Sequence, residues 1–299
     1  MNDLIINTAR LNLLRVLSHR LVHKIPDNIC CRAFINCMNK KAKELGMNHS
    51  EFINPSGLGE DNVYSVSTAR DLAIMAAKAQ QNDIIKTIWK TKEKHIQITK
   101  PYFYLPHNKQ QKKLCSTIHQ SLLDDKYPIL GAKTGSGDGY QTLVMVCNLN
   151  GYTVSGAIMN AGSDTNRFAA MSELMEIASL TMGNTKDTIP DVVSARNACA
   201  ILINLDGKFT SLYEKNADEM SSPMSTTKVI TIMTALDYID DLTKETYITP
   251  HDLRHISSDI FYRWDRTSVF NLLYAAMLTS SNVAANALAR IAGESFLSS

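Results

Sequence analysis

One short segment pairs a serine with a lysine at a spacing that suits a nucleophile and its base. Ser225 stands three residues before Lys228, where a polar loop runs into an apolar stretch with helical character. Residues three apart on a helix share a face, so the hydroxyl and the amine can interact. A serine attacks once its proton is removed, and a lysine accepts that proton when burial or nearby cations lower its pKa. Ser225 is the only serine with lysine at this spacing, although such a pair on a surface would be inert.

Two triplets have side chains that could bind a peptide substrate. Ser280-Ser281-Asn282 separates two apolar helical stretches. Its first hydroxyl could relay a proton and its amide could hold a peptide group, although Ser and Asn also cap helices. Lys133-Thr134-Gly135 opens a strand-like run. There a cation and a hydroxyl suit a carboxylate and glycine admits a ligand close to the backbone, whereas the alternative is a strand with an exposed lysine.

Hydrophobic periodicity predicts the helices that carry these motifs. A leader at residues 1–32 is basic, with leucines at helical spacing. Further helices are predicted at 33–46, where Gly46 gives a stop, from Ser67 to residue 80, at 164–182, and after the loop that precedes Ser225. The tail reads as two helices with a break at 279–282.

Strand patterns predict an antiparallel sheet between and beside these helices. Apolar, β-branched runs fill residues 131–161, and Asn150-Gly151 between two of them is a strong hairpin signal. A second hairpin is predicted at 199–213, turning at Asp206-Gly207. Residues 82–130 are mixed, with one strand-like stretch at 95–99.

Composition fits an ordinary globular protein and excludes several other classes. Of 299 residues, 44% are hydrophobic and 20% are charged, which argues against a disordered chain, a collagen or a coiled coil. The formal net charge of +2 gives no electrostatic reason to expect nucleic acid or a membrane surface as a partner. The 6 cysteines form no CxxC pair and no zinc-like spacing with histidine. We therefore expect free thiols, buried at Cys147 and Cys199, and no metal.

The three motifs together resemble those of the D-alanyl-D-alanine carboxypeptidases, the low-molecular-mass penicillin-binding proteins. Longer segments carry the same resemblance: FINCMNKKAKELGMNHSEFINPSGL, STARDLAIMAAKA, GAKTGSGDGYQTLVMV, LYEKNADEMSSPMSTTKVITIMTAL and LLYAAMLTSSNVAANALARIAG. Together they cover most of residues 33–180 and 199–295. The resemblance implies an α/β fold of the α+β type, like that of β-lactamases and transpeptidases. In that fold an antiparallel sheet is flanked by helices, and a helical subdomain holds Ser280 and Asn282.

The resemblance also implies a role for each motif residue. Ser225 would form an acyl-enzyme with Lys228 as its base, and Ser280 would pass the proton to the leaving amine. The residues that would bind the substrate are Asn282, Lys133, Thr134 and Gly135. The backbone N–H groups of Ser225 and Ser136 would form the oxyanion hole. No cofactor is needed. The expected partners are the D-Ala-D-Ala end of peptidoglycan peptides and the β-lactam antibiotics that mimic it.

The order of the motifs differs from that of the family. Lys133-Thr134-Gly135 should follow the other two motifs, yet here it precedes them. The chain resembles a circular permutation: a C-terminal-type half at 33–182, a linker at 183–198, and an N-terminal-type half at 199–299. The rival account is two half-domains from different domains, which would need a domain-swapped homodimer to complete a site.

The family acts outside the cytoplasmic membrane, which implies a cell-envelope location. Residues 1–24 lack the unbroken apolar core of a signal peptide, so we read no export signal there. Two other functions stay open. One is an inactive, rearranged penicillin-binding relic, and the other is a β-lactamase or esterase on the same scaffold.

Overall fold

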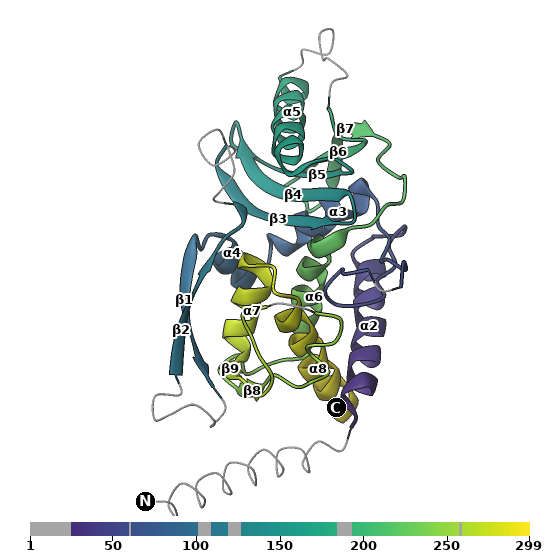
Figure 1. Ribbon diagram of the computed structural model, residues 1–299. Coiled ribbons are helices and arrows are strands. Elements are labelled where there is room, and N and C mark those ends of the chain that lie inside the picture. The colour runs from purple at the N-terminus through teal and green to yellow at the C-terminus, as the bar shows by residue number, and fades with distance from the viewer. Residues whose placement is uncertain (1–24, 60, 101–108, 119–126, 184–192, 257–258) are drawn as a thin grey trace, which may run out of the picture.

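A five-stranded antiparallel sheet forms one part of the molecule, with helices on both of its faces (Figure 1). The computed structural model describes residues 25–59, 61–100, 109–118, 127–183, 193–256 and 259–299. The strand order is β3-β4-β5-β6-β7. The strand bounds are Ile129–Gly137 for β3, Tyr140–Leu149 for β4, Tyr152–Met159 for β5, Asn197–Ile203 for β6 and Phe209–Lys215 for β7. The predicted strands of 131–161 and the predicted 199–213 hairpin thus share one sheet.

Alternation along β4 explains why both faces of the sheet are covered. Leu143, Met145 and Cys147 lie in the core beneath α5 (Asp164–Met182). Val144 and Val146 point into the other core, which contains α3 (Ala69–Ala79). Successive strand residues face opposite sides, so a run that is apolar at every position needs a helix on each side.

The two hairpins predicted from the sequence are confirmed. β4 and β5 turn at Asn150 and Gly151, which both have positive φ, at +52° and +86°. β6 and β7 pair antiparallel and turn around Gly207, at φ +78°. Pairing of β5 with β6 then joins strands on either side of the predicted linker at 183–198.

Helices form the second part of the molecule, below the sheet in Figure 1. α8 (Asn282–Ser298) packs against α2 (Asp27–Glu44), α6 (Thr227–Ala235) and α7 (Val269–Leu278). Every residue of α6 is buried. The predicted break in the tail is confirmed, because α7 ends at Leu278 and α8 begins at Asn282.

The first described helix begins earlier than the sequence predicts. α2 starts at Asp27, after Pro26, so residues 27–32 belong to it and not to a separate leader. Cys30 and Cys31 are buried, and a Cβ on Gly293 of α8 would lie 2.0 Å from the Cys30 carbonyl oxygen. This close crossing of α8 holds the extra turn in place, which is a tertiary contact that local periodicity does not reveal. The C-terminus lies beside the first turn of α2 (Figure 1).

A smaller sheet and one short helix complete the fold. The strand order of this four-stranded sheet is β2-β1-β9-β8. The strand bounds are Lys109–Cys115 for β2, Glu93–Thr99 for β1, Arg266–Ser268 for β9 and Glu245–Tyr247 for β8. β1 contains the strand predicted at 95–99. The helix α4 (Asp83–Trp89) precedes it.

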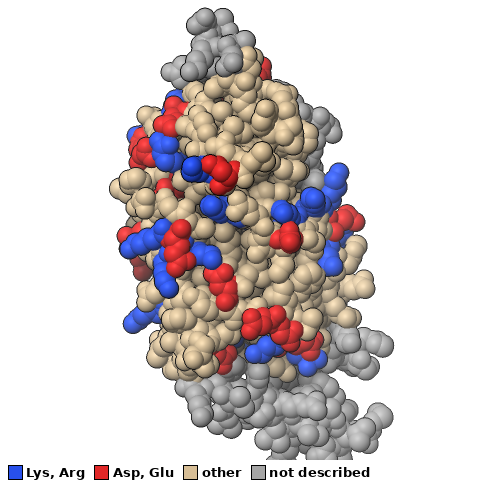
Figure 2. Space-filling model, turned by 180° about the vertical axis from the view of Figure 1, so that it is seen from behind, with Lys and Arg blue, Asp and Glu red and all other residues tan. Residues whose placement is uncertain are grey.

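Several sequence predictions concern residues outside the described ranges, namely the leader at 1–24 and most of the linker at 183–198. In the described part of the chain, all cysteines are free thiols, and Cys147 and Cys199 are buried as predicted. Among the same residues, none of the helices combines the length and apolar character that crossing a membrane requires. The face shown in Figure 2 mixes Lys and Arg with Asp and Glu.

Candidate active site

Ser225 lies in a single 3₁₀ turn, Met224–Thr226, immediately before α6. Met224 has a left-handed backbone, at φ +49°, which turns the chain sharply into Ser225. Two glycines let neighbouring segments approach this turn. A Cβ on Gly57 would lie 1.9 Å from the Met224 carbonyl oxygen, and a Cβ on Gly135 of β3 would lie 3.1 Å from the Ser225 nitrogen. The half-buried serine is therefore held between the loop around Gly57 and the strand β3.

Lys228 is fully buried one turn further on. Its Nζ donates to the carbonyl oxygen of Ser56 at 2.8 Å, to Ser225 Oγ at 2.8 Å and to Asn282 Oδ1 at 2.7 Å. Burial lowers the pKa of Lys228 well below its ordinary value, and the charge of Lys133 lowers it further. In the neutral amine the contact with Ser225 reverses, because the hydroxyl can then donate to the nitrogen lone pair. This is the arrangement a general base requires.

Lys133 comes from β3 and is also fully buried. Its Nζ donates to Ser280 Oγ at 3.0 Å and to the carbonyl oxygen of Thr134 at 2.8 Å. Burial, assisted by the charge of Arg167, lowers the pKa of Lys133 to about 7. The next side chain, Thr134, shares a 3.0 Å hydroxyl contact with Thr117.

The break between α7 and α8 links the two lysines. Ser280 has a left-handed backbone, at φ +59°, and contacts Lys133, while Asn282 contacts Lys228. Ser281 between them caps α8, with its hydroxyl accepting from Ala284 N at 3.0 Å. Adjacent residues of one triplet thus either cap the helix or contact a buried lysine. The three motifs predicted from the sequence meet within one chain.

Two parts of the site were not predicted from the sequence. One is the backbone of Ser56, whose loop is fixed by Asn54: the amide oxygen accepts from Gly57 N at 2.8 Å. The other is Arg167 of α5, which is 5% exposed. Its guanidinium donates to the Gly135 carbonyl oxygen at 2.9 Å and to Ser136 Oγ at 2.7 Å. The sequence feature that could have pointed to Arg167 is its position three residues after Asp164, with which it forms a 2.7 Å ion pair.

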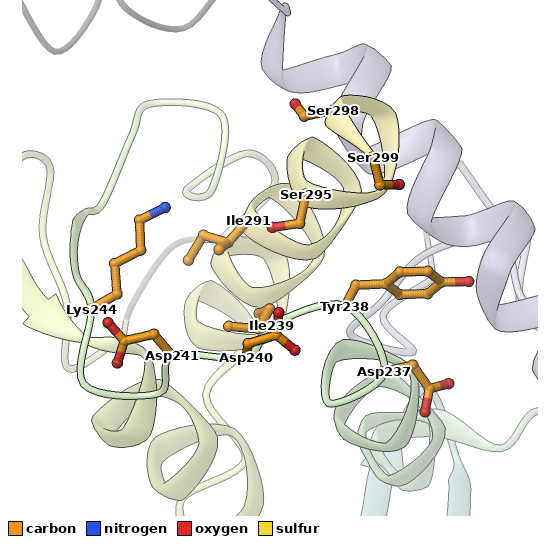
Figure 3. A pocket seen from close by; sticks show the side chains of 10 residues that line it. All are labelled: Asp237, Tyr238, Ile239, Asp240, Asp241, Lys244, Ile291, Ser295, Ser298 and Ser299. Atoms are coloured by element: carbon orange, nitrogen blue, oxygen red, sulfur yellow. The ribbon is translucent and has the colours of Figure 1, made fainter.

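A separate hollow lies at the far end of α6 (Figure 3). It is bordered by the segment after α6 and the last turns of α8, and its lining residues are Asp237, Tyr238, Ile239, Asp240, Asp241, Lys244, Ile291, Ser295, Ser298 and Ser299. None of the predicted site residues lines it. Among the described residues, no group of three or more His, Cys, Asp or Glu side chains could hold a metal ion.

Comparison with known proteins places these motifs in a family context. The sequence model described as D-alanyl-D-alanine carboxypeptidase matches residues 25–163 and 184–296. A D-alanyl-D-alanine endopeptidase of Escherichia coli (strain K12) is 34% identical over 155 residues, which are 52% of this chain and 46% of that protein. The D-alanyl-D-alanine carboxypeptidase DacF of Bacillus subtilis (strain 168) is 29% identical over 148 residues, 48% of this chain and 34% of that protein.

A third relative matches over a stretch of similar length. A D-alanyl-D-alanine endopeptidase of Pseudomonas aeruginosa is 29% identical over 144 residues, 48% of this chain and 43% of that protein. The matched part thus spans less than half the length of each of these relatives. No solved structure matches the chain significantly.

Proposed function

Because the chain belongs to the D-alanyl-D-alanine carboxypeptidase family, we propose that it cleaves D-alanyl-D-alanine bonds of peptidoglycan peptides through a serine acyl-enzyme. One observation carries the proposal: Lys228 contacts both Ser225 and Asn282, while Lys133 contacts Ser280 on the other side of the same break. A nucleophile and a base with a lowered pKa thus lie within hydrogen-bond reach of each other, and a second lysine contacts the same helix break.

The proposed reaction begins with proton transfer from Ser225 Oγ to Lys228 Nζ, across the 2.8 Å contact. The Oγ atom attacks the carbonyl carbon between the two D-alanines, an ester bond forms and the amide C–N bond breaks. The proton passes through Ser280 to the leaving amine. Water then hydrolyses the ester, which frees the shortened peptide and restores the serine.

Two features would stabilise charges on the substrate. The N–H groups of Ser225 and Ser136 are proposed to hold the oxyanion, an idea supported by the close approach of Gly135 to the Ser225 backbone. Lys133, Thr134 and the guanidinium of Arg167 at the same strand are proposed to attract the terminal carboxylate.

We propose that the chain is a circularly permuted domain, with 33–182 and 199–299 as its exchanged halves. Its support is that the two halves of one chain can complete the sheet and the site together, since β5 pairs with β6 and Lys133 contacts Ser280. The C-terminal end of α8 and the start of α2, which unpermuted relatives would connect, also lie together (Figure 1). A cell-envelope location follows from the proposed substrate.

A fluorescent penicillin tests the proposal directly. It should label the folded protein, and peptide mapping should place the adduct on Ser225, because the β-lactam imitates the D-Ala-D-Ala end. Ser225→Ala should lose the label while keeping its melting temperature. Folded wild-type protein that takes up no label, or that carries it on another residue, would refute the acyl-enzyme proposal.

Product analysis separates the remaining functions. Free D-alanine released from a pentapeptide marks a carboxypeptidase, whereas cleavage of a cross-linked peptide dimer marks an endopeptidase, the activity named for two of the relatives. Binding of penicillin without turnover of either substrate would indicate a relic. Rapid nitrocefin hydrolysis would indicate a β-lactamase.

A further inference from the structure

Asp259, on the segment leading to β9, contacts the break that holds Ser280 and Asn282. Its two carboxylate oxygens share the hydroxyl proton of Ser281, whose Oγ lies 2.7 and 2.9 Å from them, and one oxygen accepts a longer hydrogen bond from Val283 N at 3.4 Å. The carboxylate is anchored on its own segment by Ile260 N at 2.7 Å and Phe261 N at 3.4 Å. Asp259 thus links its own segment to Ser281, which lies 22 positions later in the chain.

The break needs such a support because its backbone is strained. Ser280 is a non-glycine residue in the left-handed region, at φ +59°, and such residues persist where the surroundings hold them. The two residues that follow Ser280 are the N-cap of α8, Ser281, and its first residue, Asn282. Fixing Ser281 from outside therefore fixes the directions in which Ser280 and Asn282 project toward Lys133 and Lys228.

Asp259 also brings a negative charge to the site. The carboxylate of Asp259 holds Ser281, and the next residue, Asn282, accepts from Lys228 Nζ at 2.7 Å. The ionisable groups acting on Lys228 from the surrounding elements are Lys133 of β3, whose protonated form lowers the pKa of Lys228, and Asp259, whose negative charge raises it. Arg167 of α5 adds a further cation next to Lys133. Among the described residues, the atoms that hydrogen-bond to Lys228 Nζ are neutral: the Ser56 carbonyl oxygen, Ser225 Oγ and Asn282 Oδ1. Within the described residues, no lysine or arginine forms an ion pair with Asp259, so its charge is left to act on the site.

We propose that Asp259 is a positioning residue that fixes the Ser280–Asn282 break through Ser281 and stabilises the positive charge that develops on Lys228 during acylation. The proposal rests on the proposed function for its catalytic consequence. Its two parts are separable, because Ser281→Ala removes the hydrogen bond to Asp259, together with the cap on Ala284 N, and keeps the charge, whereas Asp259→Asn removes the charge and keeps a hydrogen-bond acceptor.

The first experiment measures the rate of acylation by a fluorescent penicillin as a function of pH. Ser281→Ala should slow acylation on the order of tenfold without moving the acid limb of the profile, since it loosens the break and leaves Asp259 in place. Asp259→Asn should slow acylation and also move the acid limb to lower pH, on the order of 0.5–1 unit, because the protonated lysine loses its anion. Asp241→Asn is the matched control: Asp241 also accepts from a hydroxyl and a backbone N–H, those of Thr243, and should change neither quantity.

The second experiment does not depend on activity. NMR titration of protein labelled at the lysine ¹³Cε atoms should show that Lys228 loses its proton at a lower pH in Asp259→Asn and at the wild-type pH in Ser281→Ala. Thermal melting confirms that each variant is folded. Unchanged titration in Asp259→Asn, an equal shift in both variants, or an unchanged acylation rate in Ser281→Ala overturns the proposal. If the wild type takes up no penicillin while the titration moves as expected, the acyl-enzyme proposal fails and the placement of Asp259 stands.

Discussion

Replacement of Lys133 by methionine should stabilise the protein at neutral pH and remove part of the pH dependence of its stability. Lys133 is fully buried, and its pKa falls from 10.5 to about 7 in the fold. Between these two values the unfolded chain binds the proton that the folded chain has lost, so stability rises with pH across this window. The difference corresponds to about 4 kcal/mol of destabilisation at pH 7 and about 1 kcal/mol at pH 10. Methionine keeps the length of the side chain and carries no proton.

Urea denaturation of the wild type and of Lys133→Met at several pH values between 7 and 10 measures this effect. The variant should be the more stable at pH 7, and its advantage should shrink by about 3 kcal/mol by pH 10. Lys90→Met, at an exposed position, is the control and should give a difference that does not change with pH. If the difference between Lys133→Met and wild type is also constant, burial does not remove the proton from Lys133 and the reasoning is refuted.

Two further substitutions test the packing that holds the site. Gly57→Ala should lower the free energy of unfolding by about 2–4 kcal/mol and remove most of the penicillin labelling. The reason is that φ at Gly57 is +76° and the new Cβ would lie 1.9 Å from the Met224 carbonyl oxygen. A melting temperature and labelling equal to those of the wild type would show that the loop can move away. Asp252→Asn should cost about 3–5 kcal/mol in urea denaturation, because it leaves the buried Arg290 guanidinium without the carboxylate at 2.9 Å. Asp83→Asn in the exposed pair with Lys86 is the control, expected to change stability by about 0–1 kcal/mol, and equal effects of the two would count against the buried pair.

Much of the fold follows from local signals that the sequence carries. The hairpin at Asn150-Gly151 was predictable because few other residue pairs accept two successive positive φ values. The break before α8 was predictable because Ser and Asn cap helices, and Ser281 does so. The start of α2 was not predictable, since its first turn is held by α8 from the opposite end of the chain.

The candidate site likewise combines residues that the sequence predicts with residues that it does not. The residue types and spacings of Ser225 and Lys228 indicate a nucleophile and a base, and the family resemblance extended this to the other two motifs. Arg167 gave no comparable signal, because an arginine three residues after an aspartate is ordinary in a helix. The Ser56 carbonyl gave none either, because any residue could supply a backbone oxygen.

By itself the sequence determined which chemical groups are present and which local turns and helix breaks carry them, since these depend on neighbouring residues. The tertiary structure decided that Lys133 lies 3.0 Å from Ser280, 147 positions away, and that both lysines are buried. It thereby decided the protonation of the site, because the pKa of a lysine depends on solvent exclusion and on charges from distant segments. No local pattern encodes either quantity.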